Sequence, residues 1–161
     1  NGERGMAMEF GHLRVVHNQA RRCGCGNRGC LEAYASATAV AQRFAEKSGI
    51  DTDARLVYEY ARDGNKHAAL MLNETGQYLG MAIAEAIKLL DIETVTISGG
   101  LSHAWHLIHP PLMTELNNNL IPPLRDKVNV LHSTLADHEG LLGAAYIASH
   151  RHSTVPSLLL Q

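Results

Sequence analysis

The chain has no surplus of positive charge and no long apolar run, and these absences exclude two classes of protein. Its 14 Lys and Arg residues against 16 Asp and Glu residues give a net charge of −2 with His neutral. Electrostatic binding to nucleic-acid phosphates requires an excess of basic residues, so we expect no direct nucleic-acid contact by this chain. No apolar run approaches the ~20 residues that cross a bilayer, and no signal-peptide hydrophobic segment opens the sequence. We therefore expect a soluble, cytoplasmic protein without a membrane partner.

Cysteine is also scarce. The 161 residues contain three cysteines, all between positions 23 and 30. An odd, clustered set without a secretion signal favours metal binding over a disulfide framework. With 45% hydrophobic and 19% charged residues, the composition is that of one folded domain. The chain also begins without Met, and we interpret it as starting in the middle of a longer protein.

Sequence patterns predict alternating helices and strands. A β-branched run followed by Gly99 and Gly100 and then a polar helix start is typical of an α/β fold. Ser36 is a good N-cap and Gly49 a good C-cap for one of the helices. The predicted strands cover residues 12–17, 94–98 and 128–131. The predicted helices cover residues 53–62, 67–90, 111–119 and 139–149, preceded by one that starts near residue 31, restarts at Ser36 and ends before Gly49. Residues 150–161 have no periodicity and are expected to form a frayed tail.

Two glycines interrupt the longest predicted helix. Gly76 and Gly80 lie four residues apart, on the same face. Each costs an isolated helix about 1 kcal/mol relative to alanine. We expect close approach of another element as the compensation.

The three cysteines are separated by glycines, as a compact metal site requires. Thiolates converge on one ion only if the backbone turns tightly between them, which glycine allows at no steric cost. Cys23, Cys25 and Cys30 leave a tetrahedral zinc site one ligand short, and we assign the fourth position to His12, with His17 as the second choice. A closed site with four protein ligands is structural. The alternative is three buried free cysteines.

Two carboxylates flank this segment. Glu9 lies three residues before His12, and Glu32 lies two residues after Cys30. A metal bound by His12 and Cys30 would bring both carboxylates together, and such acceptors beside an imidazole suit a sugar. The alternative is that both are solvated surface acids.

At this point the residues resemble the ROK family (repressors, open reading frames, kinases), and most closely its bacterial glucokinase branch. The resemblance runs from residue 1 to about residue 149. It is carried by these segments: Gly5-Met-Ala-Met-Glu9-Phe-Gly-His12, Cys23-Gly-Cys-Gly-Asn-Arg-Gly-Cys30-Leu-Glu32, Ala35-Ser-Ala-Thr38, Ile97-Ser-Gly-Gly100 and Ala136-Asp-His-Glu-Gly-Leu-Leu-Gly-Ala-Ala145.

The resemblance implies an α/β fold, namely the C-terminal lobe of an actin-like, ribonuclease-H-like sugar kinase with a zinc-stapled loop. It implies roles for eight positions: zinc bound by His12, Cys23, Cys25 and Cys30, sugar hydroxyls contacted by Glu9, His12 and Glu32, and nucleotide approached by Gly99 and Gly100, with His12 serving both metal and sugar. From the residues alone, a glycine pair between strand and helix suits either phosphate binding or a tight turn.

The implied activity of the parent protein is phosphorylation of a hexose by ATP with Mg²⁺, in a homodimer. The family's catalytic Asp lies in the N-terminal lobe, and no Asp-x-Gly-x-Thr phosphate loop occurs in this chain. We therefore expect the chain alone to be inactive as a kinase. The family pattern also has Gly before its sugar-binding Glu, whereas this chain has Met8, whose side chain is expected to narrow the pocket or to shift Glu9.

Two other functions fit the same residues. One is the sugar-sensing effector lobe of a transcriptional repressor, because the resemblance extends to that branch. The other is a zinc-stabilised domain without a ligand. Ligand-induced stabilisation separates the domain without a ligand from the kinase and the repressor lobe, because a domain that binds a sugar gains stability with sugar concentration.

Overall fold

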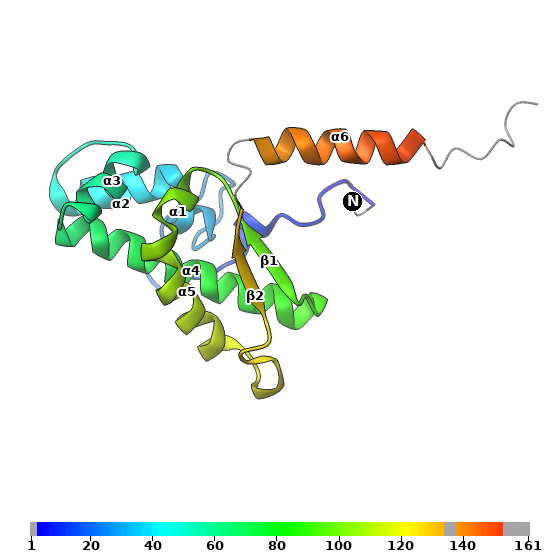
Figure 1. Ribbon diagram of the computed structural model, residues 1–161. Helices are drawn as coiled ribbons and strands as arrows, with labels where there is room; N and C mark the ends of the chain where they lie inside the picture. Colours follow the sequence, from blue (N-terminus) through cyan, green and yellow to red (C-terminus); the bar gives the residue numbers. More distant parts are fainter. Residues whose placement is uncertain (1–2, 134–137, 153–161) are drawn as a thin grey trace, which may run out of the picture.

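A computed structural model of the chain describes residues 3–133 and 138–152 (Figure 1). Within these residues the chain is mainly helical, with two short strands and three 3₁₀ turns. The elements are η1 (Phe10–His12), α1 (Glu32–Ala35), α2 (Ala37–Ser48), α3 (Ala54–Arg62), α4 (Lys66–Leu90), β1 (Thr94–Ile97), η2 (Gly100–Ala104), α5 (Trp105–Asn119), η3 (Pro122–Leu124), β2 (Asn129–His132) and α6 (Glu139–His152).

The two strands form a parallel pair. Thr94 lies opposite Asn129, and Ile97 lies opposite His132. The connection between them runs through α5, which makes a β-α-β crossover of the kind that parallel pairing requires. This arrangement confirms the predicted α/β organisation, and both strands lie within one residue of the predicted ranges.

The hydrophobic core is centred on α4, which is packed against α2, α3 and α5. Phe44 of α2 and Val57 of α3 are fully buried against it. The caps agree with the sequence: the Ser36 hydroxyl accepts a hydrogen bond from the Ala39 amide at 3.1 Å, and Gly49 ends α2 with φ +73°. These helices form the platform on which α1 and the cysteine segment rest.

Gly76 and Gly80 lie where α4 crosses α5. A Cβ atom on Gly76 would lie 2.4 Å from the Ile108 carbonyl oxygen, and one on Gly80 would lie 2.5 Å from the Leu112 carbonyl oxygen. Real Cβ atoms do not approach backbone oxygen this closely, so only glycine permits the observed crossing. The predicted close approach of another element is confirmed.

Helix α5 begins at Trp105, six residues before the predicted start. Pro110 and Pro111 therefore lie inside the helix, where proline removes a backbone donor and is normally a helix breaker. The ring of Pro111 faces Gly76, and Ile108, one turn before Leu112, is buried in the same contact. Packing against α4 thus extends the helix past a local stop signal.

The predicted strand over residues 12–17 is wrong. Residues Phe10–His12 form a 3₁₀ turn, and Arg14 makes a single antiparallel bridge with Cys30. No neighbouring strand is available in the described residues to extend the bridge into a ladder. β-branched content alone therefore predicted more regular structure than the chain forms.

Helix α6 reaches His152, three residues beyond its predicted end, and its residues 140–150 are all exposed (Figure 1). Residues 153–161, most of the predicted tail, lie outside the described residues, as do 134–137, which contain Ala136 and Asp137 of the last motif. None of the helices among the described residues is long and apolar enough to cross a membrane.

Candidate functional site

The segment between residues 13 and 31 is folded back on itself by backbone hydrogen bonds. The Leu31 amide donates to the Leu13 carbonyl at 2.8 Å, and the Val15 amide donates to the Gly29 carbonyl at 2.8 Å. Gly29 has φ +83°, and a Cβ atom there would lie 1.9 Å from the Val16 carbonyl oxygen. A side chain at position 29 is therefore excluded, and the tight return brings Cys30 back beside the start of the segment.

Four potential metal ligands meet in this segment, and they are the four named from the sequence. One ligand atom from each of His12, Cys23, Cys25 and Cys30 lies within 4.8 Å of all the others. His17, the second choice, is exposed and does not belong to this group. Convergence of the three thiols with His12 agrees with the glycine spacing.

The distances within the cluster fit a tetrahedral zinc ion. The Cys25 and Cys30 sulfurs are 3.7 Å apart, and the Cys23 sulfur is 3.7 Å from His12 Nδ1. Zinc–sulfur bonds of about 2.3 Å place tetrahedral ligands about 3.8 Å from one another. The donor set has the composition of a closed structural zinc site, with no place left for a catalytic water.

Two of the thiols differ in acidity. Burial raises the pKa of the Cys30 thiol to about 12, whereas a backbone hydrogen bond from Asn27 lowers the pKa of Cys25. A metal binds thiolates, so its uptake must displace the Cys30 proton. Metal binding at this cluster is therefore coupled to proton release and is favoured by higher pH.

His12 also faces the first flanking carboxylate. Its Nδ1 atom is the nitrogen beside Cys23, and its Nε2 atom lies 3.8 Å from a Glu9 carboxylate oxygen. The His12 side chain is 33% exposed and the Glu9 side chain is 51% exposed. One imidazole thus presents one nitrogen to the sulfur cluster and the other to a solvent-accessible acid.

The second carboxylate lies beside Cys23. Glu32 opens α1, and its Oε1 atom lies 3.9 Å from the Cys23 sulfur. Gly11 packs beside it, because a Cβ atom at position 11 would lie 3.7 Å from Glu32 Oε2. Glu9 and Glu32 therefore both lie beside the four potential ligands, Glu9 next to His12 and Glu32 next to Cys23.

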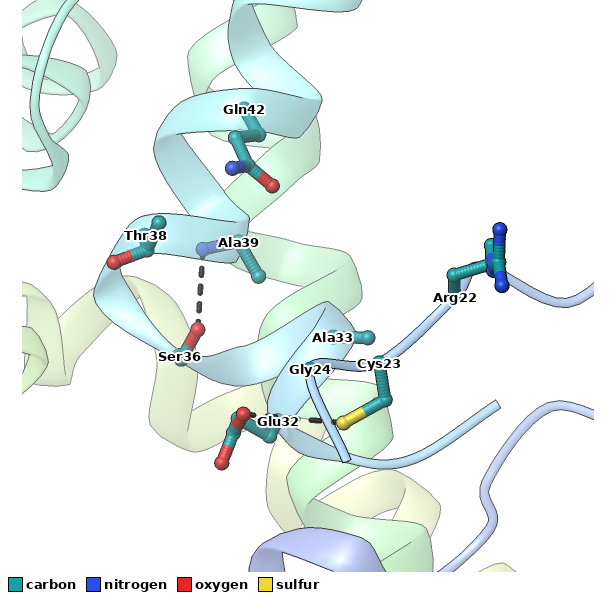
Figure 2. Close-up of a pocket in the computed structure, with 9 residues that line it drawn as sticks. All are labelled: Arg22, Cys23, Gly24, Glu32, Ala33, Ser36, Thr38, Ala39 and Gln42. Atoms are coloured by element: carbon teal, nitrogen blue, oxygen red, sulfur yellow. Dashed lines mark hydrogen bonds between the residues drawn. The ribbon is translucent and has the colours of Figure 1, made fainter. Parts of the chain in front are cut away.

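A cavity of about 430 Å³ opens beside Glu32, between the cysteine segment and the start of α2 (Figure 2). Its polar lining includes side chains that we did not assign to a site from the sequence: Arg22, Ser36, Thr38 and Gln42. Thr38 and Gln42 are four residues apart on α2, a spacing that places them on one helix face. This four-residue spacing is the signal in the sequence that could have indicated these two residues. It identifies a site only when Glu32 is known to line the same cavity.

Met8 adopts a backbone conformation that suits glycine. Its φ is +68°, in the left-handed region that side chains other than glycine, asparagine and aspartate seldom enter. Its exposed side chain lines a separate, mainly apolar cavity of about 400 Å³ beside Phe10 and Ile83. Methionine in place of glycine at position 8 therefore strains the backbone. Its side chain does not line the cavity of Figure 2.

Replacement Met8→Gly is expected to raise the free energy of unfolding by about 0.5 to 1 kcal/mol, because it relieves the left-handed strain. Urea denaturation measures the change. Met6 is a matched control, since it is similarly exposed and has no positive φ. Met6→Gly should leave stability unchanged or lower it; equal effects of the two substitutions would contradict the strain at Met8.

Gly100, the second glycine of the pair after β1, lies at a third cavity. Gly99 has φ +87°, and a Cβ atom on Gly100 would meet open space. Gly100 lines a cavity of about 320 Å³ together with Asp53, Tyr58 and His103. Open space beside backbone at a strand-to-helix turn is the arrangement in which a phosphate or nucleotide approaches closely.

The chain is similar in sequence to proteins of known function. The ROK family matches residues 1–151. The chain is 33% identical to the glucokinase of Thermotoga maritima, over 93% of this chain and 51% of that protein. It is 30% identical to the Escherichia coli K12 DNA-binding transcriptional dual regulator NagC, over 99% of this chain and 41% of that protein. The chain thus spans about half the length, or less, of these curated relatives.

A solved structure of a ROK family protein has a similar fold. The ROK family glucokinase from Streptomyces griseus, determined in complex with glucose and AMPPNP, superposes with a TM-score of 0.76 at 30% identity, covering 89% of this chain and 52% of that one. The fold is therefore that of ROK sugar kinases, an actin-like, ribonuclease-H-like α/β architecture. On sequence, motifs and fold together, the chain belongs to the ROK family.

Proposed function

We propose that this chain is the sugar-recognition part of a glucokinase-like enzyme that phosphorylates a hexose with ATP and Mg²⁺. The observation that carries the proposal is the placement of His12, whose Nδ1 atom faces the Cys23 sulfur and whose Nε2 atom faces Glu9, while Glu32 also lies beside the Cys23 sulfur. The glucokinase relatives support the class of reaction. The structural relative solved with glucose and AMPPNP supports a hexose and ATP as ligands.

Zinc is the metal that the four donors fit, and its role in the proposal is to hold the sugar-binding groups in place. His12 would bind it through Nδ1, the nitrogen on the cluster side. Coordination at one ring nitrogen leaves the ring proton on the other. His12 Nε2 then presents an N–H donor outward, toward the sugar site.

The carboxylates complete the sugar site. Ionised Glu9 and Glu32 accept hydrogen bonds only, and sugar hydroxyls can donate two bonds to them while accepting one from His12 Nε2–H. Charge-assisted bonds of this type are stronger than neutral ones. A hexose carries hydroxyl donors around its ring, whereas an apolar or anionic ligand does not. The two carboxylates therefore favour a sugar as the ligand.

The nucleotide is assigned to Gly99 and Gly100 and to the cavity beside them. The open space at Gly100 supports this assignment. Phosphoryl transfer depends mainly on positioning, with Mg²⁺ on the phosphates and an Asp on the attacking hydroxyl. We assign no Asp of this chain to that role, and we propose that the chain alone has no kinase activity. A homodimer remains a prediction from the family.

A repressor effector lobe is the second candidate. It is favoured by the match to NagC, which extends over 99% of this chain. Both candidates use the same metal cluster and the same sugar contacts. They differ in whether a phosphate donor is bound, so AMPPNP binding near Gly100 favours the kinase.

Glucose binding by the metal-loaded chain tests the proposal. Glucose should raise the thermal unfolding midpoint, and Glu32→Gln should weaken binding about 10- to 100-fold, because a hydrogen bond to a charged group is worth about 1.5 to 3 kcal/mol. Glu93→Gln is a matched control, since Glu93 is an exposed acid outside the site. L-glucose controls for sugar that stabilises proteins only by exclusion from their surface. Equal shifts with both enantiomers, or unchanged binding in Glu32→Gln, would refute the sugar site.

A further inference from the structure

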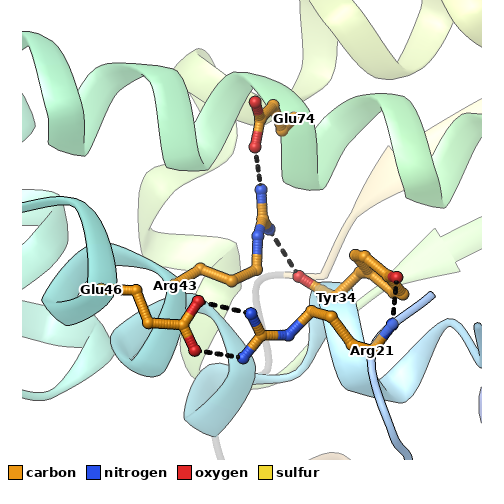
Figure 3. Close-up of polar contacts among 5 residues, drawn as sticks. All are labelled: Arg21, Tyr34, Arg43, Glu46 and Glu74. Atoms are coloured by element: carbon orange, nitrogen blue, oxygen red, sulfur yellow. Dashed lines mark hydrogen bonds and ion pairs between the residues drawn. The ribbon is translucent and has the colours of Figure 1, made fainter. Parts of the chain in front are cut away.

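A buried arginine lies beside Tyr34 of α1, the helix that also carries Glu32 (Figure 3). Arg43 of α2 is 6% exposed, and its guanidinium donates a hydrogen bond to the Tyr34 carbonyl at 2.7 Å. A second nitrogen of the same group pairs with the Glu74 carboxylate on α4. The guanidinium also lies 5.3 Å from the centre of the Tyr78 ring. One side chain thereby joins α1, α2 and α4.

Helix α1 depends on such contacts. It has four residues, Glu32–Ala35, and a helix of one turn has no stability of its own in water. Its last carbonyls lack helical partners, and Arg43 supplies a charged donor to one of them. The Tyr34 hydroxyl accepts a further hydrogen bond from the Arg21 amide at 2.8 Å. The orientation of α1 is therefore set by groups outside the helix.

Glu32 is consequently located between two anchored points. Cys30, two residues before it, belongs to the metal cluster. Tyr34, two residues after it, is held by Arg43. A shift of α1 at its Arg43 end would move Glu32, whose Oε1 atom lies 3.9 Å from the Cys23 sulfur, while leaving Cys30 in place. The metal alone is thus insufficient to orient the carboxylate.

We propose that Arg43, held by Glu74, is a positioning residue that sets the orientation of Glu32 for sugar binding. This inference rests on the proposed function. Arg43 does not line the cavity beside Glu32, so it acts through α1. A lysine keeps the charge but offers no planar fork that reaches the Tyr34 carbonyl and Glu74 in two fixed directions.

Figure 3 also shows a matched control in the same network. The Arg21 guanidinium pairs with Glu46 through two hydrogen bonds, at 2.5 and 2.8 Å. Its contact with Tyr34 is made by the backbone amide, which any substitution except proline retains. Arg21→Lys therefore makes the same chemical change as Arg43→Lys and leaves both hydrogen bonds to Tyr34 intact.

The test compares Arg43→Lys and Arg21→Lys in the metal-loaded chain, at a temperature where both are fully folded. Arg43→Lys should weaken glucose binding about tenfold in calorimetric titration, since small misplacements of a binding group have effects of this size or larger. It should also speed hydrogen exchange of the α1 amides without changing the zinc content. Arg21→Lys should leave both affinity and exchange unchanged.

The two readouts separate the outcomes. Faster exchange with unchanged glucose affinity would show that Arg43 is merely structural and would overturn the inference. Unchanged exchange and affinity in Arg43→Lys would overturn it as well. If the unsubstituted chain binds no hexose, the proposed function fails, and the exchange of the α1 amides still shows whether Arg43 orients the helix that carries Glu32.

Discussion

Removal of the metal is expected to unfold the segment from residue 13 to residue 30 and to lower the free energy of unfolding by at least about 5 kcal/mol. Structural zinc contributes about 10 to 16 kcal/mol of apparent binding energy in small domains, and this energy is available only to the folded ligand set. The segment buries few apolar side chains of its own, because only Ala20, Cys23 and Cys30 are among the buried hydrophobic residues. Urea denaturation with and without a chelator measures the loss.

Substitution of one metal-binding residue is expected to destabilise the chain as removal of the metal does, and His17 provides a control. Cys30→Ser should abolish stoichiometric zinc binding and shift the unfolding midpoint toward that of the chelated chain. His17→Gln should change neither, because His17 lies outside the cluster. One zinc per chain in the control and none in Cys30→Ser is the expected metal analysis. A metal-free chain that unfolds at the same urea concentration as the loaded chain would contradict the structural role of the metal.

A methyl group at the crossing of α4 and α5 is the second change with a large effect. Gly76→Ala is expected to cost about 3 kcal/mol or more, because the added Cβ atom would lie 2.4 Å from a backbone oxygen that cannot move without shifting α5. The helix propensity of alanine would by itself stabilise α4 by about 1 kcal/mol. The sign of the change therefore shows which effect dominates.

Gly143→Ala in α6 is the matched control. A Cβ atom at position 143 meets nothing within 4 Å, so this variant should be neutral or slightly more stable. Thermal and urea unfolding of both variants give the comparison. Stabilisation by Gly76→Ala would show that the two helices do not approach as closely as described.

Local signals in the sequence were sufficient for most helices. Ser36 and Gly49 cap α2 through their own side chain and backbone conformation, which neighbouring residues determine. The pair Gly76 and Gly80 indicated a close crossing. The start of α5 could not be predicted, because its extension past Pro110 depends on packing against α4. The strand predicted at residues 12–17 lacked a partner, which only the tertiary structure reveals.

Some residues of the site could likewise be predicted from the sequence, whereas others could be found only in the folded structure. The cysteines are close in sequence, so their spacing predicted the cluster, and His12 followed from the open fourth position. Arg43 was not identified, because its partners Tyr34 and Glu74 lie nine and 31 residues away and meet it only in the fold. Thr38 and Gln42 likewise gain their place beside Glu32 only when α2 packs against the cysteine segment.

In the proposed function His12 joins the metal ligands to the sugar site, and nitrogen NMR of the zinc-loaded, ¹⁵N-histidine-labelled chain can detect both contacts of its ring. The spectrum should show His12 bound to metal through Nδ1 with its proton on Nε2, and D-glucose should shift the Nε2 resonance. Loss of that signal in His12→Gln assigns it among the 10 histidines. Metal bound through Nε2, or an Nε2 resonance unmoved by saturating D-glucose, would contradict the account.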